Sequence, residues 1–162
     1  MNTIPGDELQ AILRRAVESD SEGAASLFSE LGGILPVPLG DEGMRHWRSL
    51  LDHPGTTVFV AEIQAVLASI AVLHILPNMT NMARPYALIE NVVTSAGYRG
   101  KGLGRLVMEA AINHAWQQNA YKIMLVTGKN RKDGGVLGFY ERLGFTSNKK
   151  HALTMRCVPE RD

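Results

Sequence analysis

The residues most suited to chemistry lie in a glycine-rich hexapeptide, Arg99-Gly100-Lys101-Gly102-Leu103-Gly104. Glycine has no Cβ, so main-chain N–H groups at these positions can approach an anion closely. An apolar run, residues 88–94, precedes the hexapeptide and a helical pattern follows it. The start of a helix adds unpaired N–H donors and partial positive charge, and Arg99, Lys101 and Arg105 add formal charge. The segment predicts a pyrophosphate-binding turn between a strand and a helix.

Two well-known phosphate loops do not fit this hexapeptide. A P-loop ends in Gly-Lys-Ser/Thr, and a dinucleotide fingerprint needs G-x-G-x-x-G with an acidic residue about 20 residues further on. The chain lacks the first ending, and counted from Gly100 it lacks the third glycine of the second motif. Residues 119–122, near the expected acidic position, hold no carboxylate. Both alternatives fail on spacing.

The pattern R-x-x-G-x-G after a strand resembles the GCN5-related N-acetyltransferase (GNAT) family, whose members bind the pyrophosphate of acetyl-coenzyme A (acetyl-CoA) with it. Residues 139–145, Phe-Tyr-Glu-Arg-Leu-Gly-Phe, match the downstream family motif F-Y-x-x-x-G-F at the family's spacing. The resemblance covers roughly residues 11–158. It implies the α/β (α+β) acyl-CoA N-acyltransferase fold, a mixed and mostly antiparallel sheet with helices on both faces.

The resemblance also implies which residues bind acetyl-CoA. In the family the fourth strand parts from the fifth, and its exposed backbone binds the pantetheine arm, with one N–H facing the thioester oxygen. Many members add an asparagine seven residues before the motif tyrosine, where this chain has Asp133, so Asn130 or backbone is expected to take that contact. The expected cofactor-binding residues are Val92, Val93, Thr94, Arg99, Gly100, Lys101, Gly102, Leu103, Gly104, Arg105 and Asn130.

Three side chains are candidates for proton transfer. Tyr140 matches the family tyrosine that protonates the departing thiolate. Glu90 is a charged residue inside an apolar strand, which is costly unless it faces a wet cleft or a partner, and partial burial would raise its pKa toward that of a working base. His74 is the second candidate base, and a hydrogen-bonded core histidine is the alternative explanation for it. Glu90 could equally bind the substrate ammonium or pair with an arginine.

The elements that must position these residues follow the order βααβββαβαβ. Alternation and turn residues predict strands over 11–17, 56–63, 66–76, 86–94, 122–127 and 150–158. Helical spacing predicts helices that start at Asp20 or Ser21, at Asp41, just after the glycines, and at Gly135. The fifth strand is expected to be buried because of its Ile-Met-Leu-Val run, and Gly144 is expected at the C′ position of the last helix.

Composition and charge bound the function. The chain has 162 residues, of which 45% are hydrophobic and 20% charged, as in one ordinary globular domain covering residues 1–162. No signal peptide or membrane span is expected, and the lone cysteine, Cys157, gives neither a disulfide nor metal-site spacing, so a cytoplasmic protein without a metal is expected. Residues 1–89 hold five basic and ten acidic side chains, whereas residues 90–162 hold twelve and six. The basic half suits a polyanionic cofactor, and no nucleic-acid motif is visible.

These features predict an acetyl-CoA-dependent N-acetyltransferase. The acetyl group would pass directly to a primary amine of a small molecule or peptide in a ternary complex, because no cysteine is placed to carry an acetyl intermediate. Two alternatives stay open: a non-catalytic acyl-CoA binding or sensing module, and transfer of another acyl group. Dimers are common in the family, so the resemblance allows a homodimer.

Overall fold

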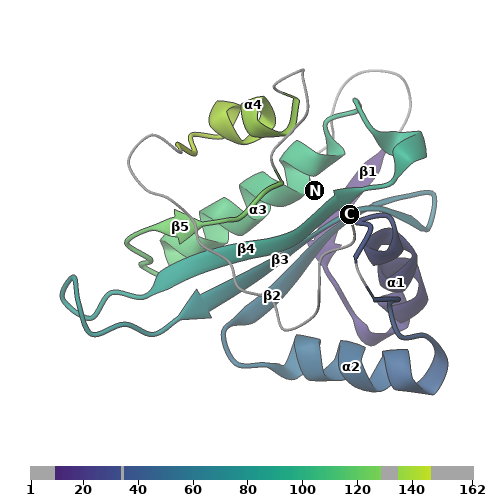
Figure 1. Ribbon diagram of the computed structural model, residues 1–162, viewed down its shortest axis with the longest axis horizontal. Helices are drawn as coiled ribbons and strands as arrows, with labels where there is room; N and C mark the ends of the chain where they lie inside the picture. The colour runs from purple at the N-terminus through teal and green to yellow at the C-terminus, as the bar shows by residue number, and fades with distance from the viewer. Residues whose placement is uncertain (1–9, 34, 129–134, 147–162) are drawn as a thin grey trace. The chain divides into compact units, whose positions relative to one another are not determined.

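The computed structural model describes residues 10–33, 35–128 and 135–146, and the chain divides into two compact units, Met1–Met124 and Leu125–Asp162. The first unit is built on a five-stranded sheet in the order β1-β2-β3-β4-β5 (Figure 1). Neighbouring strands are antiparallel except β4 and β5, which are parallel. The strands are β1 (Ala11–Arg15), β2 (Thr56–Ile63), β3 (Val66–Leu76), β4 (Tyr86–Thr94) and β5 (Ile123–Met124).

The helices of the first unit are α1 (Ser21–Ser29), α2 (Gly40–Asp52) and α3 (Leu103–Gln117), with two short 3-10 helices, η1 (Glu18–Asp20) and η2 (Ala96–Tyr98). The second unit contains α4 (Gly135–Arg142). The predicted bounds of β2, β3 and β4 are confirmed. Turn chemistry explains where β2 ends and β3 begins: Gln64 and Ala65 both have positive φ, 49° and 63°, as the two central residues of a type I′ hairpin turn require.

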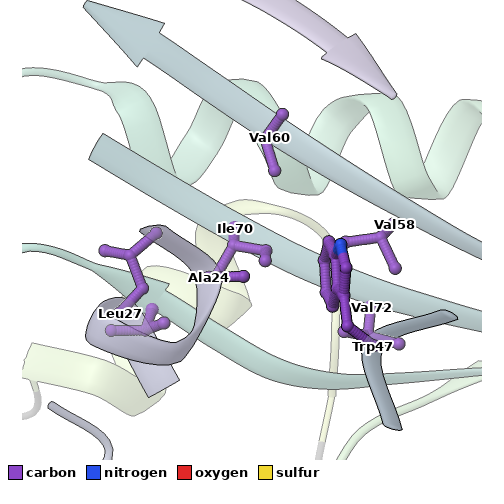
Figure 2. Close-up of a cluster of buried hydrophobic side chains, with 8 residues drawn as sticks. Ala24, Leu27, Trp47, Val58, Val60, Ile70 and Val72 are labelled. Atoms are coloured by element: carbon purple, nitrogen blue, oxygen red, sulfur yellow. The ribbon is translucent and has the colours of Figure 1, made fainter. Parts of the chain in front are cut away.

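Helices cover both faces of the sheet, as expected. On one face α1 and α2 pack on the sheet through a core cluster formed by Ala24, Leu27, Trp47, Val58, Val60, Ile70, Val72 and Val93 (Figure 2). Successive strand residues point to opposite faces, so Phe59, between Val58 and Val60, lies on the other face. Its ring is 5.9 Å from that of His114 of α3. The α3 helix therefore covers the second face.

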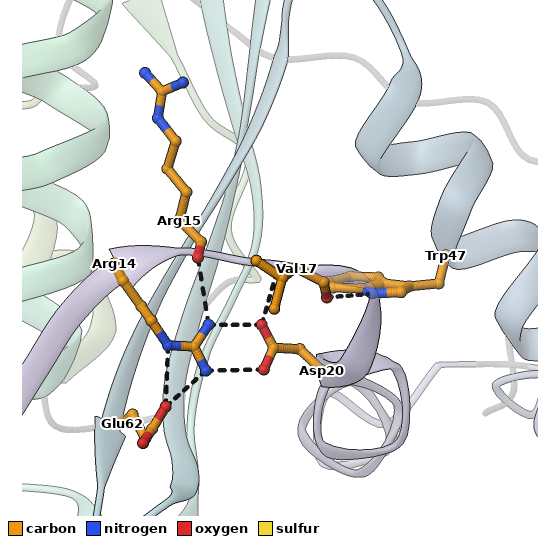
Figure 3. A network of polar contacts seen from close by, with 6 residues as sticks. All are labelled: Arg14, Arg15, Val17, Asp20, Trp47 and Glu62. Carbon is orange, nitrogen blue, oxygen red and sulfur yellow. Dashed lines mark hydrogen bonds and ion pairs between the residues drawn. The ribbon is translucent and has the colours of Figure 1, made fainter.

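A network of charged side chains joins β1 to the start of α1 (Figure 3). Arg14 binds both carboxylate oxygens of Asp20, at 2.7 and 2.8 Å, and Oε2 of Glu62 at 2.6 Å. The Val17 N–H donates to Asp20 (2.8 Å), and the Val17 carbonyl accepts from Trp47 Nε1 (3.0 Å). Asp20 is at the N-cap position of α1, but its carboxylate serves this network and does not cap the helix.

Burial alone would raise the pKa of the Asp20 carboxyl. The hydrogen bonds from Arg14 and the Val17 N–H, together with the Arg14 charge, outweigh burial, so the pKa lies below its ordinary value. The hydrogen bond to Asp20 likewise raises the pKa of Arg14. A carboxyl whose pKa is lowered by folding stabilises the fold at neutral pH and loses that contribution in acid.

Two differences from the sequence expectations stand out. The fifth strand was predicted over 122–127 and buried, which is wrong: it spans two residues, Met124 is 38% exposed and Val126 is 61% exposed. A short apolar run does not distinguish a buried strand from an exposed segment by itself, and the ladder to β4 covers only Ile123 and Met124. The first strand ends at Arg15, two residues earlier than predicted. The closing strand over 150–158 and Cys157 lie outside the described residues.

We expect Asp20→Ala to lower the free energy of unfolding by about 2 kcal/mol at pH 7, because the half-buried Arg14 loses its bidentate partner and the Val17 N–H loses its acceptor. Urea denaturation measures the change. The difference from wild type should shrink as the pH falls below about 3.9, the ordinary value for Asp.

Arg48→Ala is the matched control for this prediction. Its pair with Glu18 is 2.9 Å long, but the two side chains are 53% and 61% exposed. An exposed pair contributes less than about 1 kcal/mol. Equal losses in the two variants would show that the buried network has no special role.

Candidate functional site

The site is centred on an irregularity in β4. Ile70 of β3 pairs with Val93 and Val72 pairs with Glu90, so Asn91 and Val92 together oppose the single residue Ala71. Two residues opposite one define a β-bulge. Asn91 has a φ of 51°, a left-handed conformation that asparagine tolerates better than most residues. The bulge directly follows the candidate base Glu90. It includes Val92, the first of the expected cofactor-binding residues, and Val93 and Thr94 come next.

The pairing of β4 with β5 ends before the bulge. It covers Ala87 with Ile123 and Leu88 with Met124, and the Ala87 N–H also donates to the Lys122 carbonyl (2.9 Å). Among the strands of the described ranges, β4 from Ile89 onward pairs only with β3. This is the arrangement that the family resemblance implies for a strand whose backbone binds a ligand.

Side chains fix the end of β4 from the β3 side. Ser69, which is fully buried, donates to the Val93 carbonyl (3.1 Å) and shares a 2.8 Å hydrogen bond with Thr94 Oγ1. Val93 is buried in the core cluster beneath α1 and α2. Because these side chains are held in the fold, any ligand contact at Val93 and Thr94 would have to use the main chain.

The glycine turn, residues 99–104, leads from η2 into α3. Gly100 and Gly102 have φ values of 76° and 81°, and Gly102 is the N-cap residue of α3. A glycine offers no side chain to cap the helix, and the first turn of α3 contains no acidic residue. The first N–H groups of α3 therefore meet no side-chain cap, and this terminus suits an anion.

The three cations predicted around the glycine turn have partners within the protein. Arg99 Nε donates to the Thr94 carbonyl (3.0 Å), and Arg105 Nε binds Glu109 Oε1 (2.6 Å). Lys101 Nζ lies 5.3 Å from the centre of the Tyr98 ring. Of these three cations, Lys101 is the one that pairs with a ring instead of an oxygen. The two arginines thus serve the local structure, and the turn's distinctive donors to an anion are main-chain N–H groups.

Glu30, which sequence analysis did not identify, ties α1 to the glycine turn. It follows the last residue of α1, and its Oε2 accepts the Ala96 N–H at 2.9 Å and lies 3.5 Å from Arg99 Nη2. Both interactions are exposed. One carboxylate thus connects the helix on the α1–α2 face with the start of the turn. No sequence motif identifies Glu30, because an acidic residue near the end of a helix is usually exposed to solvent.

Glu90 and His74 share one face of the sheet. Cross-strand partners point to the same side, so Glu90 lies with Val72, and His74 lies with Leu88 two pairs further along. Val72 belongs to the core cluster under α1 and α2, which places Glu90 and His74 on that face. Glu90 is exposed and His74 is half-buried. The two candidate bases are therefore neighbours rather than alternatives at separate places.

Burial lowers the pKa of His74, the nearby charge of Glu90 opposes the shift, and His53 adds to it. The net direction of the pKa shift is downward, which favours the neutral ring, the form that can accept a proton. His74 Nδ1 is 2.9 Å from Thr56 Oγ1.

The second unit holds Tyr140 on α4. The Phe145 N–H donates to the Tyr140 carbonyl (3.1 Å) and the Gly144 N–H to the Glu141 carbonyl (2.9 Å), which is a Schellman motif with Gly144 at C′ and a φ of 94°. The Phe145 ring lies 6.1 Å from the Tyr140 ring. The prediction for Gly144 is confirmed. Tyr140 is buried, and burial raises the pKa of its hydroxyl.

Two residues of the expected cofactor contact, Asn130 and Asp133, lie outside the described residues. In the parts of the chain that the structure describes, no group of three or more His, Cys, Asp or Glu side chains could hold a metal ion. None of the described helices has the length and apolar character needed to cross a membrane.

The β-bulge at Asn91 was not predicted, and its only sequence signal is an asparagine inside a Val- and Ile-rich run.

Comparisons with known proteins agree on one family. A model of the Acetyltransferase (GNAT) family matches residues 21–145, which begin in the first unit and end in the second. A solved structure from Agrobacterium tumefaciens str. C58, provisionally named an acetyltransferase, is 41% identical, with a TM-score of 0.82, over 90% of this chain and 99% of that chain. An acetyltransferase of Trypanosoma brucei is 28% identical, with a TM-score of 0.77, over 93% and 100%.

A curated relative carries a more specific name. The glucosamine 6-phosphate N-acetyltransferase of Trypanosoma brucei brucei is 30% identical over 95 residues. The match covers 59% of this chain, and the chain spans 61% of the length of that relative.

We expect Gly100→Ala to lower the free energy of unfolding by about 1 kcal/mol, because alanine must adopt the left-handed φ of 76°. Gly97→Ala is the control, since a Cβ at either position meets no atom within 4 Å and only Gly100 has a positive φ. Thermal unfolding of the two variants measures the difference. A Gly97→Ala loss as large as that of Gly100→Ala would contradict the strain explanation.

Proposed function

This chain belongs to the Acetyltransferase (GNAT) family and is an acetyltransferase, and from that premise we propose that it moves an acetyl group from acetyl-CoA to the primary amine of a small molecule. The observation that carries the proposal is the placement of the glycine turn and the bulged end of β4, which Arg99 and Thr94 join by a hydrogen bond. Acetyl-CoA supplies the acetyl group as a thioester, which a neutral amine can attack directly.

The glycine turn has the features that a pyrophosphate requires. Left-handed glycines at 100 and 102, an uncapped start of α3 and the absence of acidic residues in its first turn all favour an anion. We assign the pyrophosphate to the main chain of residues 99–104, with Lys101 and Arg105 at its edge. The main chain of Val92, Val93 and Thr94 is assigned to the pantetheine arm and the thioester oxygen. One well-placed N–H donor there would be worth about 3 kcal/mol in the transition state.

Glu90 is assigned the removal of a proton from the incoming ammonium. An ammonium is not a nucleophile, so the enzyme must take one proton before the nitrogen can attack. Glu90 is exposed and stands next to the bulge, on the face covered by α1 and α2. A carboxylate there can attract a cationic amine and accept its proton, directly or through a water.

Tyr140 is assigned the return of a proton to the leaving thiolate, because it matches the family's motif tyrosine. Its raised pKa keeps the hydroxyl protonated at neutral pH, as an acid requires. Asn130 keeps its expected role as a contact to the cofactor. The relative's name makes an amino sugar phosphate the first acceptor to test.

We expect the purified protein to release coenzyme A thiol from acetyl-CoA faster when the correct amine is added. The measurement is a thiol-detecting assay with a panel of amines that includes glucosamine 6-phosphate, other amino sugars, polyamines and peptides. Succinyl-CoA in place of acetyl-CoA tests the preference for the acyl group. The product should have the mass of the acceptor amine plus one acetyl group, and that group should be attached to nitrogen.

The same assay separates the proposal from its alternatives. Tight acetyl-CoA binding without thiol release for any amine would indicate a binding or sensing module. Faster release from succinyl-CoA would indicate another acyl group, and release accelerated by hydroxyl compounds alone would rule out an N-acetyltransferase.

Tyr140→Phe is expected to lower kcat about 10- to 100-fold, at or below the low end for general acids. The effect is modest because a thiol with a pKa near about 8.5 leaves fairly well without an acid. Steady-state kinetics at saturating acetyl-CoA measure it, and the loss should become smaller with a thioester whose thiol is more acidic. Unchanged turnover in a folded Tyr140→Phe variant would remove the assignment.

A further inference from the structure

A tight turn brings His53 next to the start of β2. Residues 53–56 form a β-turn closed by the Thr56 N–H donating to the His53 carbonyl (3.0 Å). Pro54 precedes Gly55, whose φ is 81°, the pairing that a type II turn favours. A Cβ on Gly55 would lie 2.5 Å from the Ile75 carbonyl oxygen, so only glycine fits. The turn thus fixes His53 against the ends of β2 and β3.

Three side chains at this turn form a continuous hydrogen-bonded line. His53 Nδ1 is 3.1 Å from Thr56 Oγ1, and the same hydroxyl is 2.9 Å from His74 Nδ1. Thr56 and His74 are cross-strand partners, which explains the short distance between them. The line runs from the half-buried His74 to the exposed His53. A hydroxyl between two imidazoles can accept from one ring and donate to the other.

Glu90 lies at the inner end of this line. It shares the sheet face of His74, and its charge acts on that ring. Among the residues that the structure describes, the titratable groups that face His74 are Glu90 of β4 and His53 after α2, while β2 contributes the neutral Thr56. The turn and the hairpin do not depend on the side-chain line, because backbone hydrogen bonds, including Ile75 N–H to the Gly55 carbonyl (2.8 Å), already close them.

We infer that His74, Thr56 and His53 form a proton exit that carries the ammonium proton of the acceptor from Glu90 to solvent. The inference rests on the proposed function and adds three residues to it. Glu90 touches the substrate, whereas Thr56 and His53 act through His74 and are positioning residues.

The transfer balances as follows. The acceptor ammonium gives one proton to the Glu90 carboxylate, which passes it, directly or through one water, to Nε2 of neutral His74. The Nδ1–H proton of His74 goes to Thr56 Oγ1 as the Thr56 hydroxyl proton goes to His53 Nδ1. The Nε2–H proton of His53 then leaves to water. One proton has moved from the amine to solvent, and Glu90 is a carboxylate again.

The decisive test replaces Thr56. Thr56→Val keeps the shape of the side chain but removes the hydroxyl, and it should lower kcat about 10-fold near pH 7 with the KM for acetyl-CoA unchanged. Thr56→Ser keeps the hydroxyl and should stay within about 2-fold of wild type. Thr57→Val is the matched control, because Thr57 is the next residue of β2 and points to the opposite face. It should leave kcat unchanged.

Three further measurements distinguish proton transfer from packing. His53→Gln should also lower kcat, and added imidazole should restore much of the loss, because His53 is exposed. With an amine that is already neutral at the assay pH, such as hydroxylamine, Thr56→Val should lose little. If protons enter the line through Glu90, the double variant Glu90→Gln/Thr56→Val should be no slower than Glu90→Gln alone.

The outcomes are separable. If the wild-type protein is active and Thr56→Val has the same kcat, the proton exit is overturned and the proposed function is retained. Equal losses in Thr56→Val and Thr56→Ser, or an equal loss with the neutral amine, would also overturn it, because packing would then explain the effect. If wild-type protein released no thiol with any amine, the proposed function would fail and the proton exit with it.

Discussion

The structure depends on one constraint, the single extra residue in β4. A strand alternates its faces, so residues three apart point to opposite sides of a regular sheet. Glu90 and Val93 are three apart, yet both lie on the α1–α2 face, because their partners Val72 and Ile70 share that face. The bulge at Asn91 makes this possible. It lets one strand carry a charged, exposed residue and a core residue on the same face, with an irregular segment of backbone between them.

How much of this could be predicted depends on which interactions set each feature. The strands β2 and β3 have the predicted bounds because local signals fix their ends: a type I′ turn at Gln64 and Ala65 between them, and Pro54-Gly55 before β2. The C-terminus of α4 was predictable for the same reason, since Gly144 adopts the left-handed φ of a C′ residue. The β5 strand was predicted too long because its length depends on a partner strand. The ladder to β4 ends after two pairs, whatever the hydrophobicity of Leu125 and Val126.

The candidate site divides in the same way. The glycine turn was visible in the sequence because left-handed backbone demands glycine, and φ values of 76° and 81° at Gly100 and Gly102 agree with that demand. The partners of the charged side chains around the glycine turn could not be predicted from the sequence. The sequence places three cations near the turn, but Arg99 binds Thr94 and Glu30, and Arg105 binds Glu109. Only tertiary structure brings Glu30, 69 residues away in the chain, to Arg99. A count of charges therefore overstates what the side chains offer an anion.

The same reasoning explains why the sequence alone does not reveal the neighbours of His74. Its partners are Thr56, 18 residues earlier, and Glu90, which is a neighbour only because β3 and β4 pair in this register. In a regular ladder, a single register would pair β3 with β4 along their whole length. Here the bulge follows Glu90 directly, so the register that pairs Glu90 with Val72 and Leu88 with His74 differs by one residue from the register that pairs Val93 with Ile70. The candidate base Glu90 and the backbone that we propose to bind acetyl-CoA therefore lie in successive segments of β4, separated by the irregular backbone at Asn91.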